Sequence, residues 1–316
     1  YEMAGMEMTM VITEKIMEMV FLLLVGAVVY KTGIIDAAAN KKVSNFLLMV
    51  ISPALIISSY QMEYDVRLLQ ELLMTFALSA VSFAATILFC KIVLHSKAGV
   101  DSPVEKMAVI YSNCGFIGIP LINGILGAEG VFCMTAYTTV FNVLVWTHGV
   151  ILMSGGGEKV RMRDMWKNLV TPAMIAVVIG ITLFLTGVQL PAVIGNPISS
   201  VGDMNTPIAM IVAGINLAQG NLLASLRKVR VYYVSFLKLI VAPVITVLLL
   251  FFLSSDFNVS MTIFVASACP AGAMGTMFAL RYNRDSNYAS ELFAVSTILS
   301  MVTIPLMAAA AIPLLG

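Results

Sequence analysis

The chain has 316 residues, of which 60% are hydrophobic and only 11% are charged, and its formal net charge is +1. A soluble domain carries about a quarter charged residues, so this composition excludes an ordinary soluble protein and indicates a polytopic membrane protein. The near-neutral charge gives no reason to expect a nucleic-acid partner. Cys90, Cys114, Cys133 and Cys269 all lie in apolar runs, which favours free buried thiols over disulfides or a metal site.

Ten hydrophobic stretches are long enough to cross a bilayer, which takes about 20 largely apolar residues. In chain order they are residues 10–31, 42–60, 70–94, 104–126, 130–153, 168–188, 192–219, 229–253, 258–280 and 288–313. The connections between them are short and leave no room for a domain outside the membrane. We therefore predict an all-α membrane protein of ten transmembrane helices.

Positive charges concentrate in every second connection between these stretches. Of the 18 Lys and Arg residues, 15 lie in or beside the connections after the first, third, fifth, seventh and ninth stretch. The other three are Lys15, Arg67 and Lys238. Because basic connections remain on the cytoplasmic side, we expect these five connections inside and both termini outside.

Ten helices divide into two halves of five, and an odd number per half inserts the second half upside down relative to the first. Prolines recur at corresponding places in the two halves. Pro53 in the second stretch matches Pro207 in the seventh, and Pro120 in the fourth matches Pro270 in the ninth. We interpret the chain as a five-plus-five inverted repeat. The predicted repeats are residues 1–156 and 157–316.

Two runs of Gly, Pro and small polar residues interrupt the fourth and ninth stretches. They are residues 111–120 (YSNCGFIGIP) and 266–275 (ASACPAGAMG). Lipid cannot satisfy freed backbone groups, so such a break persists only where it is buried in protein or lines a cavity. Paired breaks in corresponding helices are typical of transporters that bind substrate at the bilayer midplane. We predict that helices four and nine break at Pro120 and Pro270 and cross there.

The broken helices offer groups that suit an organic anion. The N-terminal end of a half-helix carries free N–H groups and partial positive charge. The amide of Asn113 can donate to a carboxylate, although an interhelical hydrogen bond is the alternative. Ser267 adds a hydroxyl, and the glycines permit close approach of backbone or ligand. The predicted substrate-binding residues are Asn113, Gly115, Gly118, Pro120, Ser267, Pro270, Gly272 and Lys238.

Two ionisable residues in or beside the apolar stretches are candidates for further roles. Lys238 lies inside the eighth stretch, where it attracts the anion or supplies a fixed charge in place of a coupling cation. The alternative is that Lys238 extends its ammonium to the cytoplasmic surface. Asp203, just before Pro207, is the candidate for a coupling H⁺ or Na⁺, or else a helix cap. We expect no metal and no organic cofactor.

Residues 113–120 (NCGFIGIP) resemble the Asn-x-x-x-x-Gly-Ile-Pro crossover of the auxin efflux carrier family. Residues 270–272 (PAG) with 278–283 (FALRYN) resemble its second crossover, and residues 296–305 (STILSMVTIP) resemble its last helix. The family includes plant auxin exporters and bacterial malate and malonate permeases. The resemblance runs over essentially the whole chain.

The resemblance implies a ten-helix inverted repeat, with helices one, two, six and seven forming a scaffold and the other six a transport domain. It implies an elevator-like motion, a homodimer in a prokaryotic cytoplasmic membrane, and contact between Asn113 and a substrate carboxylate, with Pro120 and Pro270 at the crossing. The chain departs from the plant carriers because residues 70–94 lack their Asp and Lys support site.

Competing functions differ in the groups they require. A sodium- or proton-coupled carrier of another inverted-repeat family needs acidic residues at the midplane, and Asp203 is the one candidate. A membrane sensor that keeps the fold without transporting is a further alternative. An intramembrane metalloprotease needs a His-Glu-x-x-His motif, which the sequence lacks. We therefore favour a non-enzymatic carrier of small organic anions such as malate or malonate.

Overall fold

The computed structural model describes residues 2–95, 100–155, 170–220, 226–254 and 256–315, and for residues 2–8 it describes the backbone alone. The elements before residue 156 are α1 (Glu2–Lys31), α2 (Ala37–Phe46), η1 (Leu47–Ile51), α3 (Ser52–Ser59), α4 (Val66–Val93), α5 (Ser102–Ile110), η2 (Cys114–Gly118), α6 (Ile119–Leu144), η3 (Val145–Gly149) and α7 (Val150–Ser154). Those after residue 169 are α9 (Pro172–Thr186), α10 (Ala192–Asp203), α11 (Asn205–Gln219), α13 (Val229–Phe236), η4 (Leu237–Val241), α14 (Ala242–Leu253), α15 (Phe257–Ala268), α16 (Met274–Arg281) and α17 (Ser286–Leu315). The η segments are single turns of π-helix, and these described ranges contain no β-strand.

Short polar side chains begin several of these helices. The Asp36 carboxylate accepts the Ala39 N–H at 2.7 Å, and Asp65 accepts the Arg67 N–H at 2.8 Å. Asp256 does the same for the Val259 N–H at 2.9 Å. Such a cap satisfies one of the free donors of the first turn, which fixes where the apolar helix starts.

The predicted all-helical class is confirmed for the described residues, and each of the ten predicted stretches coincides with a helix or a pair of helices. Gly127, with φ 60° and ψ −143°, divides α6 at the predicted end of the fourth stretch. Within the described residues, six helical stretches are long and apolar enough to cross a membrane by length and composition. Ten crossings and the inverted repeat therefore stay predictions, and the division after residue 156 falls outside the described residues.

Large apolar side chains cover much of the outer surface. Phe252 is 79% exposed, Phe21 63%, Leu88 59% and Val302 63%. These residues come from helices in both halves of the chain. An apolar exterior of this extent is stable in lipid and not in water, so the surface indicates an integral membrane protein.

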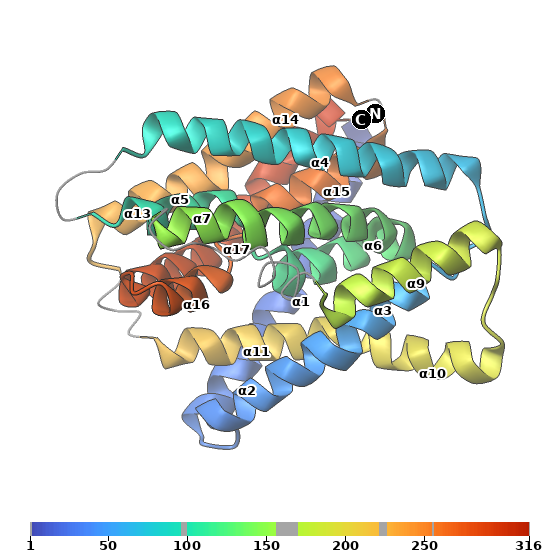
Figure 1. The fold of residues 1–316 in the computed structure, drawn as a ribbon, viewed down its shortest axis with the longest axis horizontal. Coiled ribbons are helices and arrows are strands. Elements are labelled where there is room, and N and C mark those ends of the chain that lie inside the picture. The colour runs from blue at the N-terminus through green and yellow to red at the C-terminus, as the bar shows by residue number, and fades with distance from the viewer. Residues whose placement is uncertain (1, 96–99, 156–169, 221–225, 255, 316) are drawn as a thin grey trace.

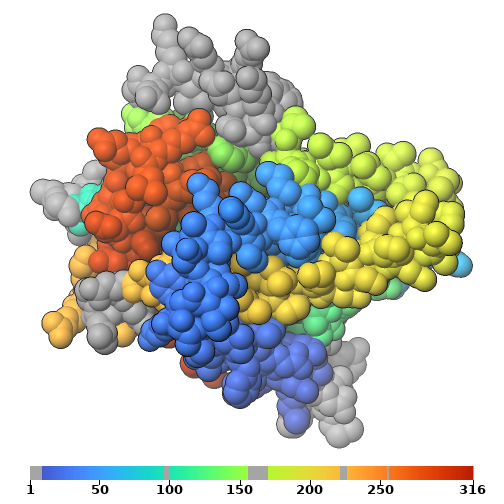
Figure 2. All heavy atoms as spheres, turned by 90° about the horizontal axis from the view of Figure 1, so that it is seen from below, coloured from blue at the N-terminus to red at the C-terminus, as the bar shows by residue number. Residues whose placement is uncertain are grey.

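The helices pack into two groups, which are visible as the lower and upper parts of Figure 1. The lower group contains α2, α3, α9, α10 and α11, and α1 joins it by packing along α11. In Figure 2 the N-terminal helices, in blue, lie beside α10 and α11, in yellow, on one face, with a red-orange C-terminal segment at their left. The upper group contains α4 to α7 and α13 to α17.

Small residues bring α1 and α11 into close contact. A Cβ placed on Gly26 would overlap the carbonyl of Ile211, and one on Gly214 would overlap the carbonyl of Leu23. Close backbone approach of this kind is the usual way to associate helices in lipid, where no hydrophobic effect drives them together. The contact packs α1 tightly onto the lower group.

Candidate functional site

The two broken segments meet in an antiparallel crossing. The first break lies between α5 and η2, and the second lies between α15 and α16. The Asn113 N–H donates to the Pro270 carbonyl at 2.8 Å, and the Gly272 N–H donates to the Tyr111 carbonyl at 2.9 Å. Ser112 and Ala271 form the bridge between these bonds. Each broken segment therefore supplies partners for backbone groups that the other helix frees.

The prediction that helix four breaks at Pro120 is wrong. The chain leaves the helix at residues 111–113, and Pro120 lies in the first turn of α6. A proline inside a helix lacks an N–H and its ring presses on the carbonyl four residues earlier. The π-turn η2 directly precedes it, and this wider turn accommodates the ring without ending the helix. Pro270, in contrast, does lie within the second break.

Lys238 reaches the crossing from η4. Its side chain is buried, and its Nζ donates to Ser112 Oγ at 2.5 Å and to the Ser267 carbonyl at 3.1 Å. Ser267 is the penultimate residue of α15, so the ammonium lies at the negative end of that helix dipole. The alternative of an ammonium that extends to the cytoplasmic surface is therefore wrong, and Lys238 links both broken segments.

No carboxylate in the described ranges pairs with Lys238. A small cavity adjoins the lysine and leaves ≈ 10 Å³ for the centre of a water molecule, which is about the space that one water needs. Its lining residues are Ser82, Phe83, Thr86, Val109, Ile110, Ser112, Tyr137, Lys238, Ala242 and Ser267. A buried ammonium without a counter-charge favours binding of an anion.

The side-chain amide of Asn113 is free to bind a ligand. Asn113 is 6% exposed, its backbone is engaged in the crossing, and its amide makes no hydrogen bond within the part of the chain that the structure describes. A Cβ on the neighbouring Gly115 would meet nothing within 4 Å, so there is open space beside it. Asn113 is also the N-cap residue of the half-helix that continues through η2 into α6.

The predicted glycines differ in their surroundings. A Cβ on Gly272 would lie 3.2 Å from the carbonyl oxygens of Tyr111 and Ser112, so this position needs glycine for the crossing to close. A Cβ on Gly118 would lie 3.4 Å from Cys269 Sγ, which is a packing contact between the two broken segments. Gly272 and Gly118 therefore serve the crossing itself, whereas Gly115 borders space.

The hydroxyl of Ser267 is already engaged. It donates to the Phe264 carbonyl at 2.8 Å, so Ser267 contributes its carbonyl to Lys238 instead of a free hydroxyl to the site. Asp203 lies elsewhere. It is exposed at the end of α10, which packs against α3, η1 and α11, and the structure does not bring it to the crossing.

The sequence interpretation missed two serines that complete the crossing. Ser112 receives the Lys238 ammonium, and Ser296 of α17 accepts the Ala271 N–H at 3.1 Å. Ser112 directly precedes Asn113 in the first break, so its position in that break could have identified it as a site residue. Ser296 is one of many small polar residues in an apolar helix, and no local pattern distinguishes it.

A second, apolar cavity lies between the two groups of helices beside the crossing. It leaves ≈ 20 Å³ for water centres and borders the half-helix that Asn113 begins. Its lining residues are Ile16, Met19, Val20, Leu23, Ile117, Leu121, Met210, Thr297, Ser300, Met301 and Ile304. The polar crossing therefore adjoins an apolar space at the contact between the groups.

A helical membrane protein whose two interrupted helices cross around a buried lysine has the features of a secondary transporter. The family model described as "Membrane transport protein" matches residues 11–308. The chain belongs to this family, the auxin efflux carrier family that the sequence motifs resemble.

Two relatives are themselves described as uncharacterized transporters. The chain is 25% identical over 301 residues to an uncharacterized transporter of Methanothermobacter thermautotrophicus, covering 93% of this chain and 96% of that relative. It is 24% identical over 221 residues to the uncharacterized transporter YfdV of Escherichia coli K12, covering 67% and 68% of the two chains. These matches support transport as the class of function and assign no substrate.

Proposed function

We propose that the protein is a secondary transporter of small organic anions, carboxylates such as malate or malonate, which bind at the crossing of the two broken helices. The observation that carries the proposal is Lys238, a buried ammonium that touches both broken segments and has no carboxylate partner among the described residues. An incoming carboxylate supplies the missing negative charge. Asn113, with an unengaged amide, adds a hydrogen-bond donor at the same crossing.

The backbone adds to this positive potential. Cys114 begins one half-helix at the crossing and Met274 begins the other. Helix N-termini present N–H groups and about half a unit of positive charge, which favours an anion without a second buried cation. The combination fits a carboxylate better than a neutral or cationic solute.

The two groups of helices suit an elevator-like mechanism, in which the upper group carries the crossing past the lower group. Close contact between α1 and α11 supports a fixed lower group, and the apolar cavity between the groups supports a sliding surface. In the proposed assembly two copies associate through the lower groups as a homodimer. In the same proposal, transport of the anion is coupled to H⁺ or Na⁺.

Uptake into liposomes tests the proposed function. Purified protein reconstituted in vesicles is expected to accumulate radiolabelled malate or malonate down an imposed gradient, and vesicles without protein are expected not to. A thermal-shift screen of mono- and dicarboxylates would rank the ligands. Absence of flux for every carboxylate under H⁺, Na⁺ and electrical gradients would leave a membrane sensor as the better description.

Asn113→Ala tests the assigned carboxylate contact. We expect weaker malonate binding by about 1.5–3 kcal/mol, the contribution of a hydrogen bond to a charged group, which corresponds to a dissociation constant raised at least tenfold. Asn196→Ala is the matched control, because Asn196 is an exposed asparagine of α10 and α10 packs against α3, η1 and α11. Unchanged affinity of purified Asn113→Ala in a calorimetric titration would remove Asn113 from the site.

A further inference from the structure

A stripe of polar residues runs along the buried face of α4. Its members are spaced three or four residues apart, so they lie on one face of the helix, about one turn from each other. All are buried within the molecule, although α4 is one of the apolar helices long enough to cross a membrane. The stripe consists of Glu71, Thr75, Ser79, Ser82 and Thr86.

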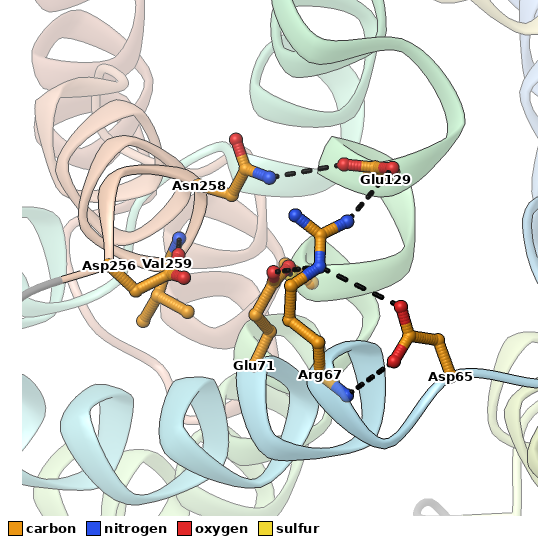
Figure 3. A network of polar contacts seen from close by, with 8 residues as sticks. Asp65, Arg67, Glu71, Glu129, Asp256, Asn258 and Val259 are labelled. Atoms are coloured by element: carbon orange, nitrogen blue, oxygen red, sulfur yellow. Dashed lines mark hydrogen bonds and ion pairs between the residues drawn. The ribbon is translucent and has the colours of Figure 1, made fainter.

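One end of the stripe is an acidic group at the start of α4 (Figure 3). Glu71 is 97% buried, since its side chain is only 3% exposed. Arg67 Nε lies 3.6 Å from Glu71 Oε1 and its Nη2 lies 3.6 Å from Glu129 Oε1. Asp256, the N-cap residue of α15, lies in the same group, and Asp65 Oδ2 lies 3.9 Å from Arg67 Nε.

A single arginine therefore lies within 4 Å of three carboxylates, and Asp256 adds a fourth carboxylate to this group. Asn258 Nδ2 donates to Glu129 at 3.1 Å, and Cys133 Sγ lies 4.0 Å from Glu71 Oε2. Glu71 Oε1 makes no hydrogen bond among the described residues. An excess of like charges around a buried carboxylate favours its taking up a proton.

The other end of the stripe reaches the lysine at the crossing. Ser82 and Thr86 line the same small cavity as Lys238, and Ser82 Oγ lies 2.9 Å from Thr246 Oγ1 of α14. The titratable groups that act on Lys238 are the thiols of Cys269, Cys114 and Cys90. Tyr137 lines the cavity too. No carboxylate in the described ranges reaches Lys238.

Between these ends the stripe contains an unengaged hydroxyl. Ser79 is fully buried, yet its Oγ has no hydrogen-bond partner in the described structure. A buried serine in a helix ordinarily donates to its own preceding turn, as Thr75 does to Glu71 and Thr86 does to Ser82. A hydroxyl both donates and accepts hydrogen bonds, so the unengaged Ser79 hydroxyl can receive a proton from one side of the stripe and release one to the other.

We propose that this stripe conducts a proton between Glu71 and Lys238, so that carboxylate transport is coupled to H⁺. The inference rests on the proposed function and assigns its coupling ion. At the acidic end an O–H bond of a hydronium ion breaks, leaving water, and its proton forms an O–H bond on the Glu71 carboxylate. That bond breaks as the proton passes along hydroxyls and bound water, and an N–H bond forms on the neutral amine of Lys238.

The cycle balances in protons and charge. Glu71 returns to a carboxylate, and Lys238 returns to an ammonium that binds the substrate anion. When the anion departs on the opposite side, Lys238 releases its proton to water there and becomes neutral again. One proton thus crosses with each carboxylate group held by Lys238. From the distribution of basic residues we expect the acidic end to face outside, so an inward proton gradient would drive uptake of the anion.

The test measures protons and malonate in the same vesicles. Purified protein is reconstituted with a trapped pH-sensitive dye, the membrane potential is clamped with valinomycin and K⁺, and labelled malonate is added outside. For the unmodified protein we expect malonate uptake with acidification of the lumen. Glu71→Gln and Ser79→Ala should each lose the acidification and the dependence of uptake on outside pH.

Ser59→Ala is the matched control, since Ser59 is a buried serine of α3 whose hydroxyl donates to the Ile56 carbonyl at 2.7 Å and is not part of the stripe. It should retain the ratio of protons to malonate. Malonate uptake without acidification in the unmodified protein would overturn the proton path and leave the proposed function standing. An unchanged ratio in Ser79→Ala or Glu71→Gln would also overturn the path, and absence of malonate and malate flux would remove both proposals.

Discussion

At the scale of single residues, the buried charges of Lys238 and Glu105 have different surroundings. Near the crossing, Lys238 has only neutral partners among the described residues. Towards the predicted cytoplasmic end, Glu105 is completely buried and fully engaged. Arg230 Nε and Nη2 each donate to it at 2.7 Å, and Tyr288 OH donates to it at 2.7 Å. The arrangement around Lys238 leaves its charge available to a ligand, whereas Arg230 and Tyr288 satisfy the charge of Glu105 within the protein.

Arg230→Ala should therefore destabilise the protein without removing a ligand contact. Loss of one member of a buried ion pair costs about 3–5 kcal/mol, and the remaining Tyr288 bond places the expected value near the lower limit. The measurement is unfolding of the detergent-solubilised protein followed by tryptophan fluorescence. Lys228→Ala serves as the control, because the Lys228 side chain is 52% exposed and its pair with Glu291 is worth about 1 kcal/mol or less. Equal losses in the two variants would contradict this account.

Lys238→Met should remove a ligand contact without destabilising the protein. Methionine fills the same apolar volume and removes a buried ammonium, so the free energy of unfolding should stay the same or rise. Malonate should no longer raise the melting temperature in a thermal-shift assay, because the charge that holds the carboxylate is absent. Retained malonate stabilisation in Lys238→Met would place the anion elsewhere.

At the scale of helices, three of the π-turns each lie just before a proline. η1 precedes Pro53, η2 precedes Pro120 and η4 precedes Pro243, in each case with one residue between the π-turn and the proline. A π-turn is a wider turn that is frequent at functional sites, and here it lets a helix continue through a proline. The π-turn η2 begins a half-helix at the crossing, and the π-turn η4 carries Lys238 to it.

Gly272→Ala tests how tightly the two broken helices cross. Its Cβ would lie 3.2 Å from two backbone carbonyl oxygens, so the segments would have to separate. Overpacking of this kind costs about 1–3 kcal/mol, and we expect a lower melting temperature together with weaker malonate binding. The control is Gly275→Ala, where the nearest atom would lie at 3.9 Å. Equal behaviour of the two variants would show that the crossing tolerates separation.

At the scale of the whole molecule, the elevator-like mechanism requires the two groups to move past each other. Gly124 of α6 and Lys15 of α1 lie across their contact, and a Cβ on Gly124 would be 3.6 Å from Lys15 Cβ. That separation suits a disulfide. Lys15→Cys with Gly124→Cys should therefore form a crosslink under oxidation that stops malonate uptake, and a reductant should restore it.

The control for that crosslink joins two helices of the lower group. Ser52 Oγ donates to Asn205 Oδ1 at 3.0 Å, so Ser52→Cys with Asn205→Cys links α3 to α11 without joining the groups. Uptake should survive oxidation in this variant. Uptake that continues in the fully crosslinked Lys15–Gly124 variant would exclude relative motion of the groups at this contact.

The sequence alone predicted the helices, the two interruptions and their meeting, because lipid leaves few solutions for broken backbone. It placed the first break wrongly, since a proline ordinarily ends a helix and the π-turn that accommodates Pro120 has no sequence signature. It identified Lys238 and Asn113 as unusual polar residues in apolar stretches. It missed Ser296 and the stripe on α4, because isolated hydroxyls in an apolar helix reveal their partners only after packing. Substrate, coupling ion and dimerisation stay proposals.

The two backbone bonds of the crossing have a consequence for biosynthesis. The Asn113 N–H and the Tyr111 carbonyl leave the ribosome long before Pro270 and Gly272, which bond to them. At about 5–20 residues per second, the first break waits roughly ten to thirty seconds for its partner. During that interval the nascent first half has unsatisfied polar backbone at membrane depth. Insertion machinery or another nascent helix must therefore shield this segment until the ninth helix arrives.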